Sequence, residues 1–166
     1  MIRSPHITPF LWFDGQAEEA ARFYTWVFPN SKITRIKRYP KNAGAEDHGH
    51  EPGAVMTVSF SLGEHDFTAI NGGPEFRFNE AVSFVVACAD QEELDFFWDS
   101  LSEGGPAESQ QCGWLKDRFG LSWQIVPACL PELMEGPGGE PVRKALLAMK
   151  KLDIAALKAA REAVVS

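Results

Sequence analysis

The fold is decided by the stretch Thr8-Pro9-Phe10-Leu11-Trp12-Phe13-Asp14, because the chain repeats its character at Ser83-Phe84-Val85-Val86-Ala87-Cys88. Both stretches are short and apolar, and both contain aromatic or β-branched residues, which is typical of strands. Each one leads into a helical pattern with an aromatic pair, Phe23-Tyr24 in the first half and Phe97-Trp98 in the second. The sequence therefore predicts an internal repeat.

The ends of the two halves align as well. Phe67-Thr68-Ala69-Ile70 closes the first half and Trp123-Gln124-Ile125-Val126 closes the second, each after a hairpin pattern. We therefore expect an α+β fold with two βαβββ modules and flanking helices. The first module covers residues 1–74, the second covers 75–130, and a helical extension covers 131–166, all within one compact domain overall.

Capping residues indicate where the helices begin. Asp14 and Asp90 follow the first strand of each half, and Glu93 forms a capping-box pattern with Asp90. Asp153 is placed to cap a short helix in the C-terminal extension. Residues 40–53 are polar and contain glycine and proline, which predicts a mobile connection between strands.

Charge and composition exclude several classes of function. The 166 residues carry a net charge of -7, which opposes binding to nucleic acid or to an anionic membrane. No apolar run approaches the ~20 residues that span a bilayer, and the first residues lack a signal pattern, so we expect a cytoplasmic protein. The chain has 3 cysteines and no CxxC spacing, which predicts free thiols.

Several longer motifs make the sequence resemble a known family. They are Ile7-Thr8-Pro9-Phe10-Leu11-Trp12-Phe13-Asp14-Gly15, Phe23-Tyr24, Asn71-Gly72-Gly73-Pro74-Glu75-Phe76, Cys112-Gly113-Trp114-Leu115-Lys116-Asp117-Arg118-Phe119-Gly120 and Ser122-Trp123-Gln124. Together they resemble the PhnB-like branch of the vicinal oxygen chelate superfamily, a branch also called 3-demethylubiquinone-9 3-methyltransferase-like. The superfamily includes glyoxalase I, extradiol dioxygenases and the fosfomycin and bleomycin resistance proteins. The resemblance implies a U-shaped mixed sheet around a ligand cleft, within a homodimer.

The methyltransferase name does not agree with the residues. A nucleotide-fold methyltransferase needs a glycine-rich turn between a strand and a helix, where the backbone approaches the cofactor. Gly72-Gly73 precedes a proline, and the glycines at 136, 138 and 139 run into Pro141. The alternating order of a doubly wound parallel sheet is also missing. We therefore expect no such cofactor.

Metal-dependent members of the superfamily place one ligand near the start of each half's first strand and another on each half's last strand. In this sequence those positions fall on Thr8, Thr68, Ser83 and Gln124. Hydroxyls and a single amide do not hold a transition metal, which prefers imidazole or carboxylate. The resemblance therefore predicts a metal-free cleft.

The period of two along a strand indicates which side chains share a face with these positions. The predicted ligand-binding residues are Thr8, Phe10, Trp12, Thr68, Ser83, Ser122 and Gln124. Such a set suits a flat, hydrophobic small molecule. Phe67 and Trp123 fall on the opposite face and are expected in the core. The alternative for Phe10 and Trp12 is that they fill the interior of the sheet.

Two further groups leave alternatives open. Glu46, Asp47, His48, His50 and Glu51 could bind a metal, or they could form a solvated acidic loop. Cys112 could be a nucleophile activated by Lys116 and Arg118, or a packed thiol. No catalytic constellation is identified, so we expect a binding protein without a cofactor. The alternative is a metal-dependent lyase, isomerase or dioxygenase, and a third possibility is a dimeric scaffold with a filled cleft.

Overall fold

The computed structural model of the protein describes residues 6–41 and 50–163. The chain divides into two compact units, Met1–Arg77 and Phe78–Ser166. Each unit has its own small mixed sheet, with 4 strands in the first and 3 in the second. The predicted α+β fold class is confirmed.

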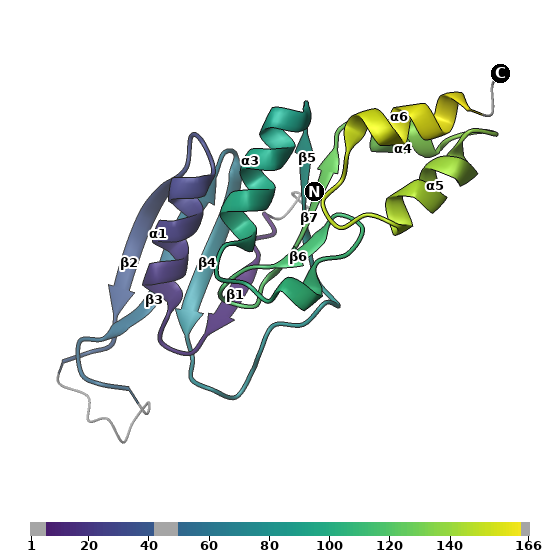
Figure 1. Ribbon diagram of the computed structural model, residues 1–166. Helices are drawn as coiled ribbons and strands as arrows, with labels where there is room; N and C mark the ends of the chain where they lie inside the picture. The colour runs from purple at the N-terminus through teal and green to yellow at the C-terminus, as the bar shows by residue number, and fades with distance from the viewer. Residues whose placement is uncertain (1–5, 42–49, 164–166) are drawn as a thin grey trace, which may run out of the picture. The chain divides into compact units, whose positions relative to one another are not determined.

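The first unit follows the predicted βαβββ order (Figure 1). Its elements are β1 (Phe10–Phe13), α1 (Ala17–Val27), β2 (Lys32–Arg38), β3 (Val55–Leu62) and β4 (His65–Asn71). The strands lie in the order β1-β4-β3-β2, so β4 is next to β1 although it is the last strand of the unit. The β1–β4 pair is parallel, while β4–β3 and β3–β2 are antiparallel.

Helix α1 covers one face of this sheet, because alternate strand residues supply an apolar surface for it. On the strands, Leu11, Phe13, Val58, Phe60, Phe67 and Ala69 are buried, and on α1, Ala17, Ala20, Ala21, Tyr24 and Val27 are buried. The core placement predicted for Phe67 is confirmed. The alternate residues of each strand lie on the opposite face, which we call the open face of the first sheet.

The start of α1 differs from the prediction. The N-cap residue is Gln16, with no side-chain cap, so the prediction that Asp14 caps this helix is wrong. The carboxamide of Asn71 in β4 accepts the backbone N–H of Ala17 at 2.8 Å and donates to the carbonyl of Val55 at 3.0 Å. A residue distant in sequence thereby satisfies an orphan N–H of the first turn.

The second unit contains β5 (Phe84–Cys88), α3 (Gln91–Ser102), a 3-10 turn η1 (Ala107–Ser109), β6 (Trp114–Lys116) and β7 (Ser122–Pro127). The strand order is β5-β7-β6, with a parallel β5–β7 pair and an antiparallel β6–β7 pair. Within the described residues this half has one strand fewer than the predicted βαβββ. Gly104-Gly105-Pro106 explains the difference, because glycine and proline disfavour a paired strand and η1 follows directly.

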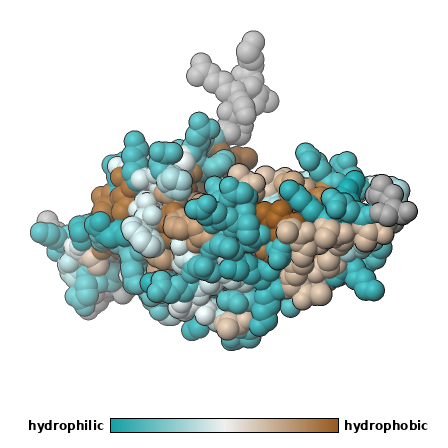
Figure 2. Space-filling model, turned by 45° about the horizontal axis from the view of Figure 1, so that its top comes forward, coloured by the Kyte–Doolittle hydropathy of each residue, from teal (hydrophilic) through white to brown (hydrophobic). Residues whose placement is uncertain are grey.

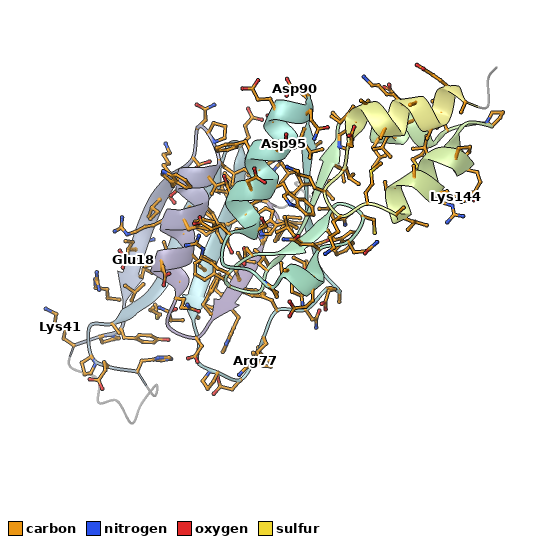
Figure 3. All side chains as sticks on the ribbon, viewed as in Figure 1. Glu18, Lys41, Arg77, Asp90, Asp95 and Lys144 are labelled. Carbon is orange, nitrogen blue, oxygen red and sulfur yellow. The ribbon has the colours of Figure 1, made fainter. Side chains whose placement is uncertain are left out.

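Helix α3 begins as the sequence predicts. The carboxylate of Asp90, labelled at the start of α3 in Figure 3, accepts the N–H of Glu93 at 2.9 Å. The carboxylate of Glu93 reaches back to the N–H of Ala89. Leu94, Phe97, Trp98 and Leu101 are buried, together with Leu115, Trp123 and Ile125 of the sheet, so the predicted core role of Trp123 is confirmed.

The C-terminal extension, as far as residue 163, contains three short helices: α4 (Leu130–Met134), α5 (Gly139–Leu147) and α6 (Ile154–Glu162). The predicted cap of α6 is confirmed, since Asp153 accepts the N–H of Ala156 at 2.9 Å. Helix α4 precedes the glycine- and proline-rich residues 135–141, and α5 begins inside that segment. No helix of the described residues is long and apolar enough to cross a membrane.

Candidate ligand-binding faces

The open face of the first sheet places several predicted residues in one row. Phe10 of β1 pairs with Thr68 of β4, and Thr68 pairs with Ser59 of β3. The hydroxyls of Ser59 and Thr68 lie 3.5 Å apart. Phe10 is 61% exposed, so it does not fill a sheet interior. An exposed ring beside a pair of hydroxyls can contact a flat molecule and hydrogen-bond to its edge.

Trp12 lies on the same face but has a different environment. Its indole N–H donates to the carbonyl of Gly73 at 2.9 Å, and its ring meets Phe76 edge-on at 4.9 Å. A Cβ on Gly72 would collide with the same indole ring. The segment after β4 therefore packs on Trp12. The polar edge of the indole is already used inside the unit, while Phe10 remains accessible.

Strand β2 adds basic residues that the sequence analysis did not select. A bulge lies between Ile33 and Arg35, so that Thr34 has no partner in the register. As a result Arg35 pairs with Ser59 and Lys37 pairs with Thr57, on the open face, while Ile36 pairs with Val58 of the core face. β-Bulges commonly redirect side chains in this way. The sequence alone does not reveal this arrangement, because a strand that alternated regularly through Thr34 would place Arg35 on the same face as Ile33.

The predicted residues of the second unit also meet on one face of their sheet. The amide of Gln124 donates to the hydroxyl of Ser83 at 2.9 Å, and Gln124 pairs with Val85 of β5 and Trp114 of β6. Val85 is 59% exposed. The hydroxyl of Ser122 is buried, and among the described residues it has no hydrogen-bond partner. This face therefore presents a hydrogen-bonded amide and hydroxyl, those of Gln124 and Ser83, next to the exposed aliphatic side chain of Val85.

The motif from Cys112 to Gly120 has a structural role in the second unit. The buried carboxylate of Asp117 accepts the backbone N–H groups of Phe119 at 2.9 Å and Leu121 at 3.0 Å. It also accepts the indole N–H of Trp123 at 2.8 Å. These bonds fix the turn between β6 and β7, which explains why this segment has a distinctive sequence. Lys116 forms an ion pair with Glu80, which holds the pKa of that carboxyl below its usual range.

Cys112 and Cys88 lie in different environments. Cys112 has a positive φ of 43°, and its N–H donates to the carbonyl of Met149 at 2.8 Å, so its position is set by the backbone. Cys88 is fully buried, and burial, aided by Glu93 and Asp90, raises the pKa of its thiol to about 12. A thiol in that state is a poor nucleophile.

The positions expected to hold a metal in metal-dependent relatives are now located. Thr8 precedes β1 and is half-buried, Thr68 bonds to Ser59, and Ser83 bonds to Gln124. In the part of the chain that the structure describes, no three His, Cys, Asp or Glu side chains gather as metal ligands. Of the acidic loop, residues 46–48 lie outside the described ranges, and His50 stacks on Tyr39 at 4.5 Å.

Comparison with known proteins agrees with the fold and with the motifs. The sequence model of the family described as 3-demethylubiquinone-9 3-methyltransferase matches residues 5–126. A PhnB protein from Bacillus cereus is 34% identical, covering 75% of this chain and 100% of its own, with a TM-score of 0.65. A protein from Pseudomonas aeruginosa is 21% identical, covering 75% of this chain and 98% of its own, with a TM-score of 0.56, and shows the fold alone. No curated protein matches the chain.

Proposed function

Since this chain belongs to the 3-demethylubiquinone-9 3-methyltransferase family, we propose that it is a PhnB-like protein of the vicinal oxygen chelate superfamily that binds a flat, hydrophobic small molecule without a metal. The observation that carries the proposal is Phe10, an exposed ring at 61% beside the hydroxyls of Ser59 and Thr68. An aromatic ring on a rigid strand offers a contact surface at little cost in conformational entropy.

The family's descriptive name is a poor guide to chemistry in this chain. Each described sheet has one parallel pair, joined to antiparallel strands, rather than the parallel sheet on which a nucleotide-type cofactor site is built. The turn from β1 to α1 contains the single glycine Gly15. These features argue against binding of a nucleoside-type methyl donor and for a role that depends on the sheet faces.

A metal-free site agrees with the residues that occupy the four expected positions. The amide of Gln124 and the hydroxyl of Ser83 bond to each other, which leaves a neutral pair where a dication would need charge-neutralising donors. Elemental analysis of the purified protein tests this proposal. About one Ni, Zn or Fe per subunit, retained after brief chelation, would overturn it and favour a metal-dependent lyase, isomerase or dioxygenase.

Ligand binding is tested by removing the exposed ring. We expect Phe10→Ala to weaken binding of aromatic hits from a small-molecule screen by roughly 2 kcal/mol, because it deletes a buried aromatic contact in the complex. Thr68→Val, on the same face, should cost less, roughly 1 kcal/mol, the usual value of one neutral hydrogen bond. Trp26→Ala is the matched control, since Trp26 is 73% exposed but lies on α1. Equal losses in Phe10→Ala and Trp26→Ala would place the site elsewhere.

We also propose a homodimer as the working form. Edge strands and exposed apolar side chains favour self-association, and Val82 and Phe76 are each 64% exposed. Hydrophobic areas separated by hydrophilic residues are visible on the face shown in Figure 2. Sedimentation at micromolar concentration tests this proposal, and a single species of 18.4 kDa would contradict it.

A further inference from the structure

We propose that the open face of the first sheet selects an aromatic carboxylate, with the aromatic body on Phe10 and the carboxylate on Arg35. This inference rests on the ligand binding proposed above and adds the charge of the ligand. It assigns Arg35, with Lys37 beside it, as the residues that determine specificity. All the residues involved belong to the unit Met1–Arg77.

The register of the sheet carries the geometry. One row crosses all four strands in the order Phe10, Thr68, Ser59, Arg35. The row next to it runs Trp12, Ile70, Thr57, Lys37. Side chains in one row point to the same side of a sheet. The first row therefore changes from aromatic at β1, through hydroxyls at β4 and β3, to cationic at β2, and the second row differs only in having Ile70 at β4.

The span of the row sets the size of the ligand. Neighbouring strands are about 4.8 Å apart, so the backbones of β1 and β2 are separated by about 14 Å across the row. The side chains of Phe10 and Arg35 are long enough to reach across part of that gap. One ring or two fused rings with a carboxylate fit it, and the hydroxyls of Thr68 and Ser59 lie beneath the polar side of such a molecule.

The cations of this face are available for a ligand. Among the described residues, Arg35 and Lys37 have neither an ion pair nor a side-chain hydrogen bond. Two other basic residues of the unit are engaged: Arg22 pairs with Glu18 at 2.6 Å, and Arg38 donates to the carbonyl of Gly53 at 3.3 Å. In a chain with a net charge of -7, unpaired cations on one sheet face provide a local attraction for an anion.

Edge protection is the competing explanation for these charges. Lysine on an edge strand prevents pairing with another sheet, and β2 is the outermost strand. For that role, a charged residue at any position along the edge strand would be sufficient. It does not account for the bulge at Thr34, which brings Arg35 into the row of hydroxyls, or for the aromatic end of the same row. The two explanations make different predictions for a matched pair of acidic and neutral ligands.

The experiment measures the affinity of the full chain for acid–amide pairs by calorimetry: benzoate and benzamide, indoleacetate and indoleacetamide, naphthoate and naphthamide. We expect at least one acid to bind about tenfold or more tightly than its amide, as a charge-assisted hydrogen bond provides. Arg35→Gln should remove that preference and leave amide binding within about twofold. Arg38→Gln is the matched control, because it removes a charge from the same strand outside the row, and it should preserve the preference.

The outcomes separate this inference from the proposed function. If amides bind and Phe10→Ala weakens their binding, but acids bind no more tightly than amides, the proposed binding site is supported and the proposed selection of carboxylates is wrong. If neither acids nor amides bind, both proposals fail. If Arg38→Gln reduces acid binding as much as Arg35→Gln, the attraction is a general field and the assignment to Arg35 is overturned. Binding of inorganic phosphate as tight as that of the acids would also overturn it.

Discussion

The two units repeat one local plan but treat their polar groups differently. In both, the first and last strands pair in parallel and a helix covers one face of the sheet. In the second unit Lys116, on the same sheet face as Gln124, is paired with Glu80, and the amide of Gln124 is bonded to Ser83. In the first unit Arg35 and Lys37 have no such partners among the described residues.

Each unit also contains a buried polar side chain that bonds to neighbouring segments of the same unit, and these two side chains differ in type. In the second unit this residue is the acidic Asp117, which is 0% exposed and accepts hydrogen bonds from nearby residues of its own hairpin. The first unit relies on a neutral residue, Asn71, which joins β4 to the start of α1 and to β3. In both units a buried polar side chain therefore bonds to groups of neighbouring segments, while its residue type and its position in the unit differ.

We expect the largest effect on stability from removing the buried carboxylate of Asp117. Asp117→Ala should lower the free energy of unfolding by about 3–5 kcal/mol, because three donors lose their acceptor inside the unit. Asn71→Ala should cost less, about 2 kcal/mol, since the hydrogen bonds that it removes are made by a neutral amide. Urea denaturation measures both. An Asp117→Ala variant as stable as the exposed-site control Asp14→Ala would break the comparison.

The next effect concerns the close contact under Trp12. Gly72→Ala should destabilise the protein by about 1–3 kcal/mol, because the added Cβ would occupy the space of the indole ring. In a Trp12→Ala background the same change should cost much less. Gly120 of the second unit is the contrast, since an added Cβ there has nothing within 4 Å and meets only the strain of a φ of 86°. Additive effects of Trp12→Ala and Gly72→Ala would contradict the contact.

Helix capping gives a smaller and more selective effect. Asp90→Ala should cost about 1 kcal/mol, the usual value for loss of an N-cap side chain. Asp14→Ala occupies the equivalent place in the first half and should cost close to nothing, because α1 starts at Gln16 without a side-chain cap. Thermal denaturation of the two variants is the measurement. Equal losses would mean that Asp14 stabilises α1 in a way that the structure does not contain.

The last prediction is a pH dependence that arises in the second unit, which contains all the cysteines. Burial raises the pKa of Cys88 to about 12 from an ordinary 9.0, so the folded state favours the neutral thiol. This contribution to stability is complete below about pH 9 and is lost as the pH rises toward about 12, because the unfolded chain releases the proton first.

The test compares the parent with Cys88→Ala in urea denaturation at about pH 8 and at about pH 10, where an unperturbed thiol ionises. The parent should lose more stability over this interval than the variant. Parallel losses in the two proteins would show that other groups, such as lysines and tyrosines, account for the whole dependence.

Local patterns predicted much of this fold and little of its long-range bonding. The strand-to-helix repeat, the cap at Asp90 and the burial of Phe67 and Trp123 follow from periodicity and side-chain chemistry within a few residues. The bond from Asn71 to Ala17 does not, because it joins residues 54 apart in the chain. The faces of β2 were hidden for another reason, since one unpaired residue at Thr34 shifts the alternation.

The C-terminal extension is attached through groups that belong to the repeat. The N–H groups of Cys112 and Gly113 donate to the carbonyls of Met149 and Lys150, each at 2.8 Å. The side-chain amide of Gln91 completes the join, donating to the carbonyl of Leu152 and accepting the N–H of Ile154. Residues beyond 126 lie outside the region that the family model matches, so these bonds join the extension to the matched region. Because the donors at positions 112 and 113 are backbone N–H groups, this part of the attachment does not depend on the side chain of Cys112.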